Sequence, residues 1–443
     1  MTTEQHDPQS LSMGQRLLNL AAEAYADSAV DVAIKLTQLA VEQEPTANAL
    51  MQLAWALRVA GDFDGAIGLY ERILEKKILP ADAAILLALG LTESERGNFG
   101  AALDYLWQVV ALGGATDLTW FYIGSCYGML RQFGPANEIF KRDNVLPLHD
   151  GRTTSTRLLR LPSQRSEVQR PSSGELPFDR DLSLSQQMTA NSSHASKADI
   201  IHLVCCDSRY LSLFARALAR SVDEKAGVNV ALHFHVVNPG PNDPPLLETL
   251  RAELNTSIAW TTERTDFRQL DVHQVQTYFS CARYLVLPEL LKYYKRPILV
   301  TDADQFIVKS LKAFMDEACR HDVSLFLQPM AHSNLLALIS ASICVANDTP
   351  RSFDFFSAVG DYCLERMTDP QAMAWHLDQA ALAAVYLASA DIDFFLIPPK
   401  TMISTMPRKK PAREAAALFW SVTYSVEANA QKLESEDFQS LRL

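Results

Sequence analysis

The chain contains 443 residues, of which 48% are hydrophobic and 21% charged, a composition typical of soluble globular proteins and a length sufficient for two domains. Its formal net charge of −12 argues against a nucleic-acid-binding surface. No apolar run approaches the roughly 18 residues that a membrane span needs, and the polar start has no apolar signal core. The seven cysteines form no CxxC pair, so we expect free thiols in a cytoplasmic protein.

The first third of the sequence repeats with a period near 34 residues. Small residues recur at Ala21, Ala54, Gly90 and Gly124, alanines follow them by twelve positions at Ala33, Ala66, Ala102 and Ala136, and large side chains follow the last three alanines at Tyr70, Leu106 and Phe140. The pattern resembles the tetratricopeptide repeat, in which small residues let two helices approach closely and neighbouring units stack. We therefore expect an α-helical solenoid over residues 12–147 that binds a protein partner or acceptor. An irregular helical bundle is the alternative.

The composition changes after the repeats. Residues 151–197 contain ten Ser and three Pro with scattered Arg and few large apolar side chains. Such a stretch buries too little surface to offset the entropy of ordering it. We therefore predict a disordered linker over residues 148–198.

Residues 199–443 alternate short apolar runs with helical patterns. Strands are expected at 200–206, 232–237, 258–261 and 297–301, and helical spacing of apolar residues separates them. This alternation predicts a parallel sheet with helices on both faces, and hence an α/β domain. His202, His233 and His235 alternate with apolar residues on two of these strands, which favours packing in the core or against the sheet over metal binding.

The strand ending at Thr301 runs directly into Asp302-Ala303-Asp304. Ligands of open parallel sheets bind beyond the carboxyl ends of the strands. If this segment is extended, residues two apart point to the same side, and Asp302 and Asp304 would aim two carboxylates at one point. Magnesium is held in this way, by one or two carboxylates together with substrate phosphates.

These residues belong to a wider pattern. Four segments match in order: Cys205-Cys206-Asp207-Ser208-Arg209-Tyr210, Cys281-Ala282-Arg283, Thr301-Asp302-Ala303-Asp304 and Asp378-Gln379. On these segments the chain resembles glycosyltransferase family 8, the retaining nucleotide-sugar transferases that include glycogenin and bacterial lipopolysaccharide galactosyltransferases. The resemblance implies a GT-A fold with a Rossmann-like mixed sheet.

The resemblance also implies a role for each matched residue. Asp207 and Tyr210 would bind the nucleotide base, Arg283 would reach the phosphates or the donor sugar, and Asp302 and Asp304 would hold Mn²⁺ or Mg²⁺. Asp378 and Gln379 would line the sugar and acceptor side, where catalysis occurs. Read without the resemblance, Asp207 and Asp378 could each cap the helix that follows, Arg283 could be a surface ion-pair residue, and Tyr210 could belong to the core.

The sequence departs from the family at two places. Ser340-Ala341-Ser342 stands where an Asn-x-Gly segment is expected, and no histidine follows His376 to provide the family's third metal ligand. The leading interpretation is a metal-dependent glycosyltransferase that moves a sugar from a nucleotide donor, most simply a uridine diphosphate sugar, to an unknown glycan or protein acceptor. The alternative is a catalytically degenerate scaffold or nucleotide-sugar-binding protein. A metal-independent transferase with two nucleotide-binding domains is a third interpretation, which needs more than the 245 residues left.

Overall fold

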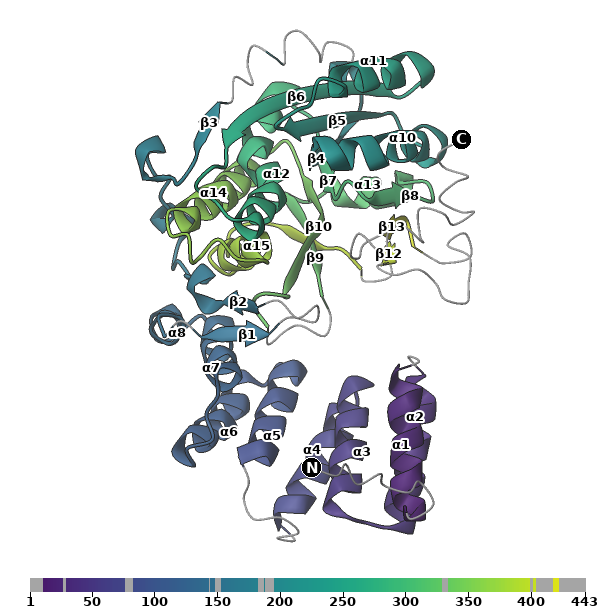
Figure 1. Cartoon of the computed structure of the whole chain (residues 1–443), viewed down its shortest axis with the longest axis vertical. Helices are drawn as coiled ribbons and strands as arrows, with labels where there is room; N and C mark the ends of the chain where they lie inside the picture. Colours follow the sequence, from purple (N-terminus) through teal and green to yellow (C-terminus); the bar gives the residue numbers. More distant parts are fainter. Residues whose placement is uncertain are drawn as a thin grey trace, which may run out of the picture. The chain divides into compact units, whose positions relative to one another are not determined.

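The computed structural model describes residues 11–26, 29–75, 83–142, 144–147, 153–181, 187, 195–328, 334–398, 401–403 and 417–421. The chain divides into two compact units that separate between Asn144 and Val145 (Figure 1). Within the described ranges, no helix is long and apolar enough to cross a membrane.

The first unit consists of helices that pack in sequential pairs, as the repeat pattern predicts. They are α1 (Met13–Ala26), α2 (Val30–Gln43), α3 (Ala47–Val59), α4 (Phe63–Glu75), α5 (Ala83–Arg96), α6 (Phe99–Ala111), α7 (Asp117–Met129) and α8 (Phe133–Phe140). Two of the tight turns between paired helices use glycine at positive φ, Gly61 (83°) and Gly97 (89°), and Arg131 (56°) takes this conformation in the last pair.

The small residues of the repeat lie where paired helices touch. A Cβ added at Gly124 would lie 2.5 Å from the ring of Phe140, and one added at Gly90 would lie 2.8 Å from Leu106. The alanines of the second helices, such as Ala66 and Ala102, are fully buried. The sequence rule of a small residue facing a large one is therefore confirmed as the packing rule of the unit.

Replacing Gly124 with alanine should destabilise the helical unit by about 1–3 kcal/mol, because the new methyl group overpacks the buried ring of Phe140. Gly68→Ala is the matched control: Gly68 lies within α4 with no atom within 4 Å of its added Cβ, and alanine there should stabilise by about 0.5–1 kcal/mol. Urea unfolding followed by far-ultraviolet circular dichroism measures both. Equal effects of the two substitutions would contradict this packing.

The second unit is an α/β domain built on an eight-stranded mixed sheet. Along the sheet the strands are β11 (Phe394–Leu396), β9 (Val323–Leu327), β10 (Ile339–Ala346), β7 (Ile298–Thr301), β4 (Ile200–Asp207), β5 (Val230–Val237), β6 (Ser257–Asp266) and β3 (Asp179–Asp181). The strands β4, β5, β6 and β7 are parallel, as the sequence predicts. The strands β10 and β3 pair antiparallel with β7 and β6, so the whole sheet is mixed.

Helices cover both faces of the sheet, which confirms that expectation. On one face α10 (Ser208–Lys225), α11 (Asp243–Glu253) and α13 (Lys312–Ala318) pack on the strands in the main apolar core. On the other face lie α12 (Val272–Tyr294), α14 (Pro350–Met367) and α15 (Leu377–Leu387). A smaller sheet of β12 (Met402–Ile403), β13 (Phe419–Ser421) and β8 (Gln305–Ile307) brings the end of the described chain beside the segment that follows Asp304.

The predicted disordered linker is wrong for the described residues 153–181. This segment belongs to the α/β unit, where β1 (Val145–Pro147) pairs with β2 (Thr153–Ser155). Leu158 is fully buried, and its carbonyl accepts a hydrogen bond of 2.8 Å from the Tyr362 hydroxyl of α14. The segment is ordered despite its low apolar content, because a few buried side chains and hydrogen bonds to α14 hold it in place.

The strand β3 comes from the same segment and places a charge inside the unit. The Arg180 side chain donates from Nε to Glu263 of β6 at 2.7 Å, and Glu263 is almost fully buried. His235 lies 3.3 Å from the same carboxylate, and Tyr278 also donates to it. Despite burial, these partners lower the pKa of Glu263 to about 2.

The three strand histidines are fully buried, in agreement with the sequence prediction. His202 hydrogen-bonds Thr301 of β7 through Nε2 at 2.7 Å, and His233 hydrogen-bonds Tyr294 at 2.8 Å. Burial lowers the pKa of both imidazoles to about 3. The folded protein therefore holds both rings neutral.

Candidate functional site

The sheet topology creates one position where ligand binding is expected. The strands β4, β5 and β6 follow one another in one direction along the sheet, whereas β7 lies on the other side of β4. In an open α/β sheet, ligands bind at the carboxyl ends of the strands where the strand order reverses. Asp207 ends β4 and Asp302 follows β7, so these two residues stand at that position.

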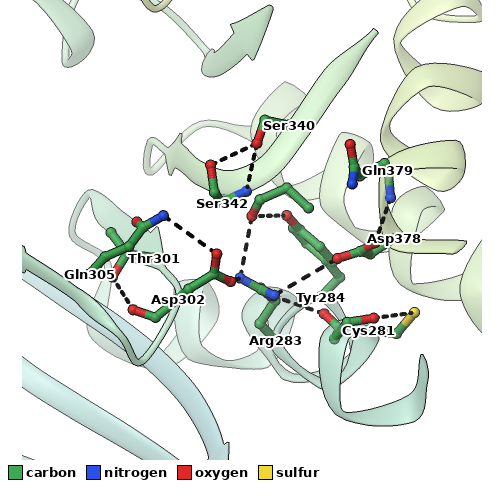
Figure 2. A network of polar contacts seen from close by, with 12 residues as sticks. Cys281, Arg283, Tyr284, Thr301, Asp302, Gln305, Ser340, Ser342, Asp378 and Gln379 are labelled. Carbon is green, nitrogen blue, oxygen red and sulfur yellow. Dashed lines mark hydrogen bonds and ion pairs between the residues drawn. The ribbon is translucent and has the colours of Figure 1, made fainter. Parts of the chain in front are cut away.

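Arg283 is the centre of a buried polar network (Figure 2). Its Nε donates to the carbonyl of Ser280 at 2.9 Å, and its Nη1 donates to Asp302 and, at 3.3 Å, to the carbonyl of Ala341. On its other side, Nη2 lies 3.8 Å from Asp378. Burial alone would lower the pKa of Arg283, yet the nearby carboxylates, chiefly Asp302, raise it well above its usual value. Arg283 is therefore buried and charged, which excludes the surface ion-pair interpretation.

Asp302 lies in a turn rather than in an extended strand, which corrects the geometry assumed from the sequence. The backbone N–H of Gln305 donates to the Asp302 carbonyl at 3.2 Å, and the Gln305 side chain donates to Oδ2 of Asp302 at 3.4 Å. The other oxygen, Oδ1, contacts Arg283. Both carboxylate oxygens of Asp302 thus have partners in the protein, and 27% of the side chain stays exposed.

Asp304 and Tyr210 lie close together on the same side of the unit. Burial raises the pKa of the Tyr210 phenol, and the neighbouring carboxylates Asp304, Asp207 and Asp302 raise it further. Asp304 itself is buried, whereas 41% of Tyr210 is exposed. Tyr210 is therefore not a core residue, and it offers an accessible aromatic ring beside an acidic group of side chains.

Asp207 caps helix α10. Its Oδ1 accepts a hydrogen bond of 2.7 Å from the backbone N–H of Tyr210. The capping interpretation is thus confirmed, and one oxygen of Asp207 is occupied by the helix. The cap also fixes the first turn of α10, which carries Tyr210.

Asp378 lies in the first turn of α15, because the helix begins at Leu377 rather than at Gln379. Its Oδ1 accepts from the backbone N–H of Gln379 at 2.8 Å, and its Oδ2 faces Arg283. Burial raises the pKa of Asp378, Arg283 lowers it, and Asp302 raises it again. Asp378 therefore caps the start of α15 with one carboxylate oxygen and directs the other toward the guanidinium of Arg283.

Gln379 and the two serines complete the wall next to Arg283 (Figure 2). When its side-chain amide nitrogen faces the segment that leads into β10, Gln379 donates to the carbonyls of Leu336 and Ile339 at 3.2 and 3.3 Å. Ser340 and Ser342, on β10, lie 2.7 Å apart through their hydroxyl oxygens. The structure thus brings the segment Ser340-Ala341-Ser342 beside the arginine, which donates to the Ala341 carbonyl.

The carboxylates fit a hard divalent cation only in part. Asp302 and Asp304 provide oxygen donors of the kind that Mg²⁺ and Mn²⁺ prefer. Among the described residues, no group of three or more His, Cys, Asp or Glu side chains could hold a metal ion. Two carboxylates leave most positions around such an ion to other ligands, so Asp302 and Asp304 would need oxygens from a bound phosphate group to complete the ligand set.

Two further groups shape the site, Gln305 and the backbone carbonyl of Ala341. Gln305 braces Asp302, and its place three residues after Asp302 is the spacing of a turn rather than of a strand. The Ala341 carbonyl accepts from both Arg283 and Tyr284, the latter at 3.2 Å. No side-chain pattern reveals a backbone acceptor, so the sequence held no signal for it.

Comparisons with known proteins bear on the helical unit. The family model described as tetratricopeptide repeat matches residues 46–78, which contain α3 and α4. Similar solved structures include a crystal structure of MamA protein (17% identity, 29% of this chain and 70% of that chain, TM-score 0.27) and MamA residues 41 to the end from Desulfovibrio magneticus RS-1 (17%, 30%, 74% and 0.27). A search of curated proteins found no match. With its helices packed in sequential pairs, the N-terminal unit is a tetratricopeptide-type repeat region.

Proposed function

We propose that the α/β unit binds a nucleoside diphosphate sugar at the carboxyl ends of β4 and β7 and transfers the sugar to an acceptor. The observation that carries this proposal is the convergence of Asp302, Arg283 and Asp378, from three separate parts of the sequence, at the point where the strand order reverses. Tyr210 and Asp304 lie beside them. The likeness to glycosyltransferase family 8 on these same residues supports the assignment.

Each residue has a task that its surroundings favour. The exposed ring of Tyr210 stacks on the base, and the guanidinium of Arg283 binds diphosphate oxygens, for which its planar fork of donors is suited. Asp302 and Asp304 would hold a divalent cation, which would supply positive charge to neutralise the leaving diphosphate. Asp378, Gln379, Ser340 and Ser342 line the sugar side, where carboxylate and hydroxyl groups accept and donate hydrogen bonds to sugar hydroxyls.

The second candidate is a nucleotide-sugar-binding scaffold without transferase activity. The observation that favours it is the engagement of both Asp302 oxygens by Arg283 and Gln305, which leaves the cation fewer free ligands. The tetratricopeptide-type repeats suit either candidate, because stacked helical repeats present an extended surface to a protein partner. In a transferase, that partner is the acceptor or a protein that delivers it.

Calorimetric titration of uridine diphosphate into the whole protein, with and without manganese, tests the proposal. We expect binding that manganese tightens by about 5- to 150-fold, the usual range of coupling between two ligands. Adenosine diphosphate under the same conditions is the control for base recognition. Absence of nucleotide binding at any manganese concentration would remove both candidates, whereas binding of a uridine diphosphate sugar without turnover toward any acceptor or water would favour the scaffold.

A further inference from the structure

Arg283 stands between the two carboxylates that the proposed reaction needs. Its Nη1 contacts Asp302, the proposed cation ligand, and its Nη2 lies 3.8 Å from Asp378 on the sugar side. The side chain is 10% exposed, and it donates hydrogen bonds to the backbone carbonyls of Ser280 and Ala341. A guanidinium in contact with Asp302 competes with any other positive charge for that carboxylate.

A divalent cation and a guanidinium on one carboxylate repel each other strongly, because little water separates charges in a buried site. The cation can bind Asp302 without this repulsion only when Arg283 binds another anion instead. A diphosphate is such an anion, since its oxygens match the arginine fork and carry more charge than one carboxylate.

We propose that Arg283 acts as a gate on cation binding: it occupies Asp302 until a diphosphate draws it away, so the cation and the nucleotide enter the site together. This inference rests on the proposed nucleotide site. It adds to that site an order of binding, in which the cation does not bind before the nucleotide. By linkage, the nucleotide tightens cation binding by the same factor as the cation tightens nucleotide binding.

A simpler cause of such coupling is a shortage of protein ligands, with the diphosphate supplying what the two carboxylates lack. The two causes predict different results when Arg283 is removed. A ligand shortage leaves cation binding to the free protein weak and the coupling intact. A gate predicts that cation binding to the free protein becomes tighter and that the coupling shrinks.

The decisive variant is Arg283→Gln combined with Asp378→Asn, which removes one positive and one negative charge and keeps the buried site balanced. Manganese is titrated into the whole protein and free ion is followed by paramagnetic resonance, with and without uridine diphosphate, after subtraction of a protein-free titration. The matched control is Arg268→Gln with Asp266→Asn, an exposed ion pair of the same unit. Circular dichroism verifies the fold of every variant.

We expect the double variant to bind free manganese about 5- to 150-fold more tightly than the natural protein, with coupling to the nucleotide reduced toward one. The control pair should behave as the natural protein does. Arg283→Lys, whose shorter side chain cannot hold both carboxylates, should tighten free-manganese binding part of the way. Unchanged manganese binding in the double variant, or in the lysine variant should the double variant fail to fold, would overturn the gate.

The same titrations separate failure of the gate from failure of the nucleotide site. If the natural protein binds no uridine diphosphate, the proposed function fails. The manganese titrations without nucleotide still decide whether Arg283 blocks Asp302: tighter binding in the double variant supports the block, and equal binding refutes it.

Discussion

An Asp304→Asn variant should bind uridine diphosphate no better with manganese than without it. Asp304 is buried beside Tyr210, and the isosteric amide removes a cation ligand while the pair of Arg283 and Asp302 stays in place. The loss should equal the whole gain that manganese gives the natural protein, about 5- to 150-fold in affinity. Asp302→Asn should lose the same gain, although it also frees Arg283 for the diphosphate.

Calorimetry of the natural protein and the two variants measures this effect. Asp316→Asn is the control, because Asp316 is an exposed carboxylate of the same unit that pairs only with Lys312 among the ion pairs of the described residues. Thermal unfolding should show that the Asp304→Asn protein remains folded. If Asp304→Asn keeps its manganese dependence, Asp304 is not a cation ligand.

The α/β unit should lose stability steeply in mild acid, between pH 6.5 and pH 3. His202 and His233 have a pKa of about 3 in the folded protein because of burial, whereas unfolded histidines take up a proton near pH 6.5. Between these values the unfolded chain binds more protons, so the free energy of unfolding falls as the pH falls. Each histidine lowers the free energy of unfolding by about 1.4 kcal/mol for each pH unit, and the two together lower it by about 3 kcal/mol for each pH unit. The usual free energy of unfolding is about 5–15 kcal/mol, so a fall of two or three pH units suffices to unfold the unit.

Urea unfolding at a series of pH values measures the slope. His202→Leu should reduce the slope by about 1.4 kcal/mol per pH unit while lowering stability at pH 7 by about 1 kcal/mol, because the hydrogen bond to Thr301 is lost. His273→Leu, at an exposed position in the first turn of α12, should leave the slope unchanged. A slope in the His202 variant equal to that of the natural protein would refute the neutral, buried state of this ring.

The sequence predicted those parts of the fold whose causes are local. Spacing of small and large residues such as Gly124 and Phe140 fixes the helix pairs, and apolar runs such as 200–206 fix the central strands. The segment 153–181 could not be predicted in this way. It is held by long-range partners, among them Tyr362 and Glu263, which lie too far along the chain for composition to reveal them.

The candidate site was predictable in its residues and less so in its geometry. Asp302, Arg283 and Asp378 lie close together, as the resemblance described above implies. Residues Asp302 to Gln305 form a turn rather than the extended segment that the sequence predicts. The backbone hydrogen bond from Gln305 to Asp302 that closes this turn leaves no signal in the apolar pattern of the preceding strand. The pairing of Arg283 with the proposed cation ligand depends on side-chain directions that only the fold determines.

The position of β3 determines at which residue a stable fragment of the α/β unit can begin. A fragment starting at residue 199 would lose Arg180, and Glu263 would be left as a buried carboxylate without its arginine. It would also lose Gln187, whose side-chain amide satisfies the backbone N–H and carbonyl of Thr262 on the outer side of β6. The strand β6 would then present open backbone groups between Thr262 and Asp266, and such an edge recruits strands from other molecules and promotes aggregation. A fragment that begins at Val145, where the two units separate, keeps this edge covered.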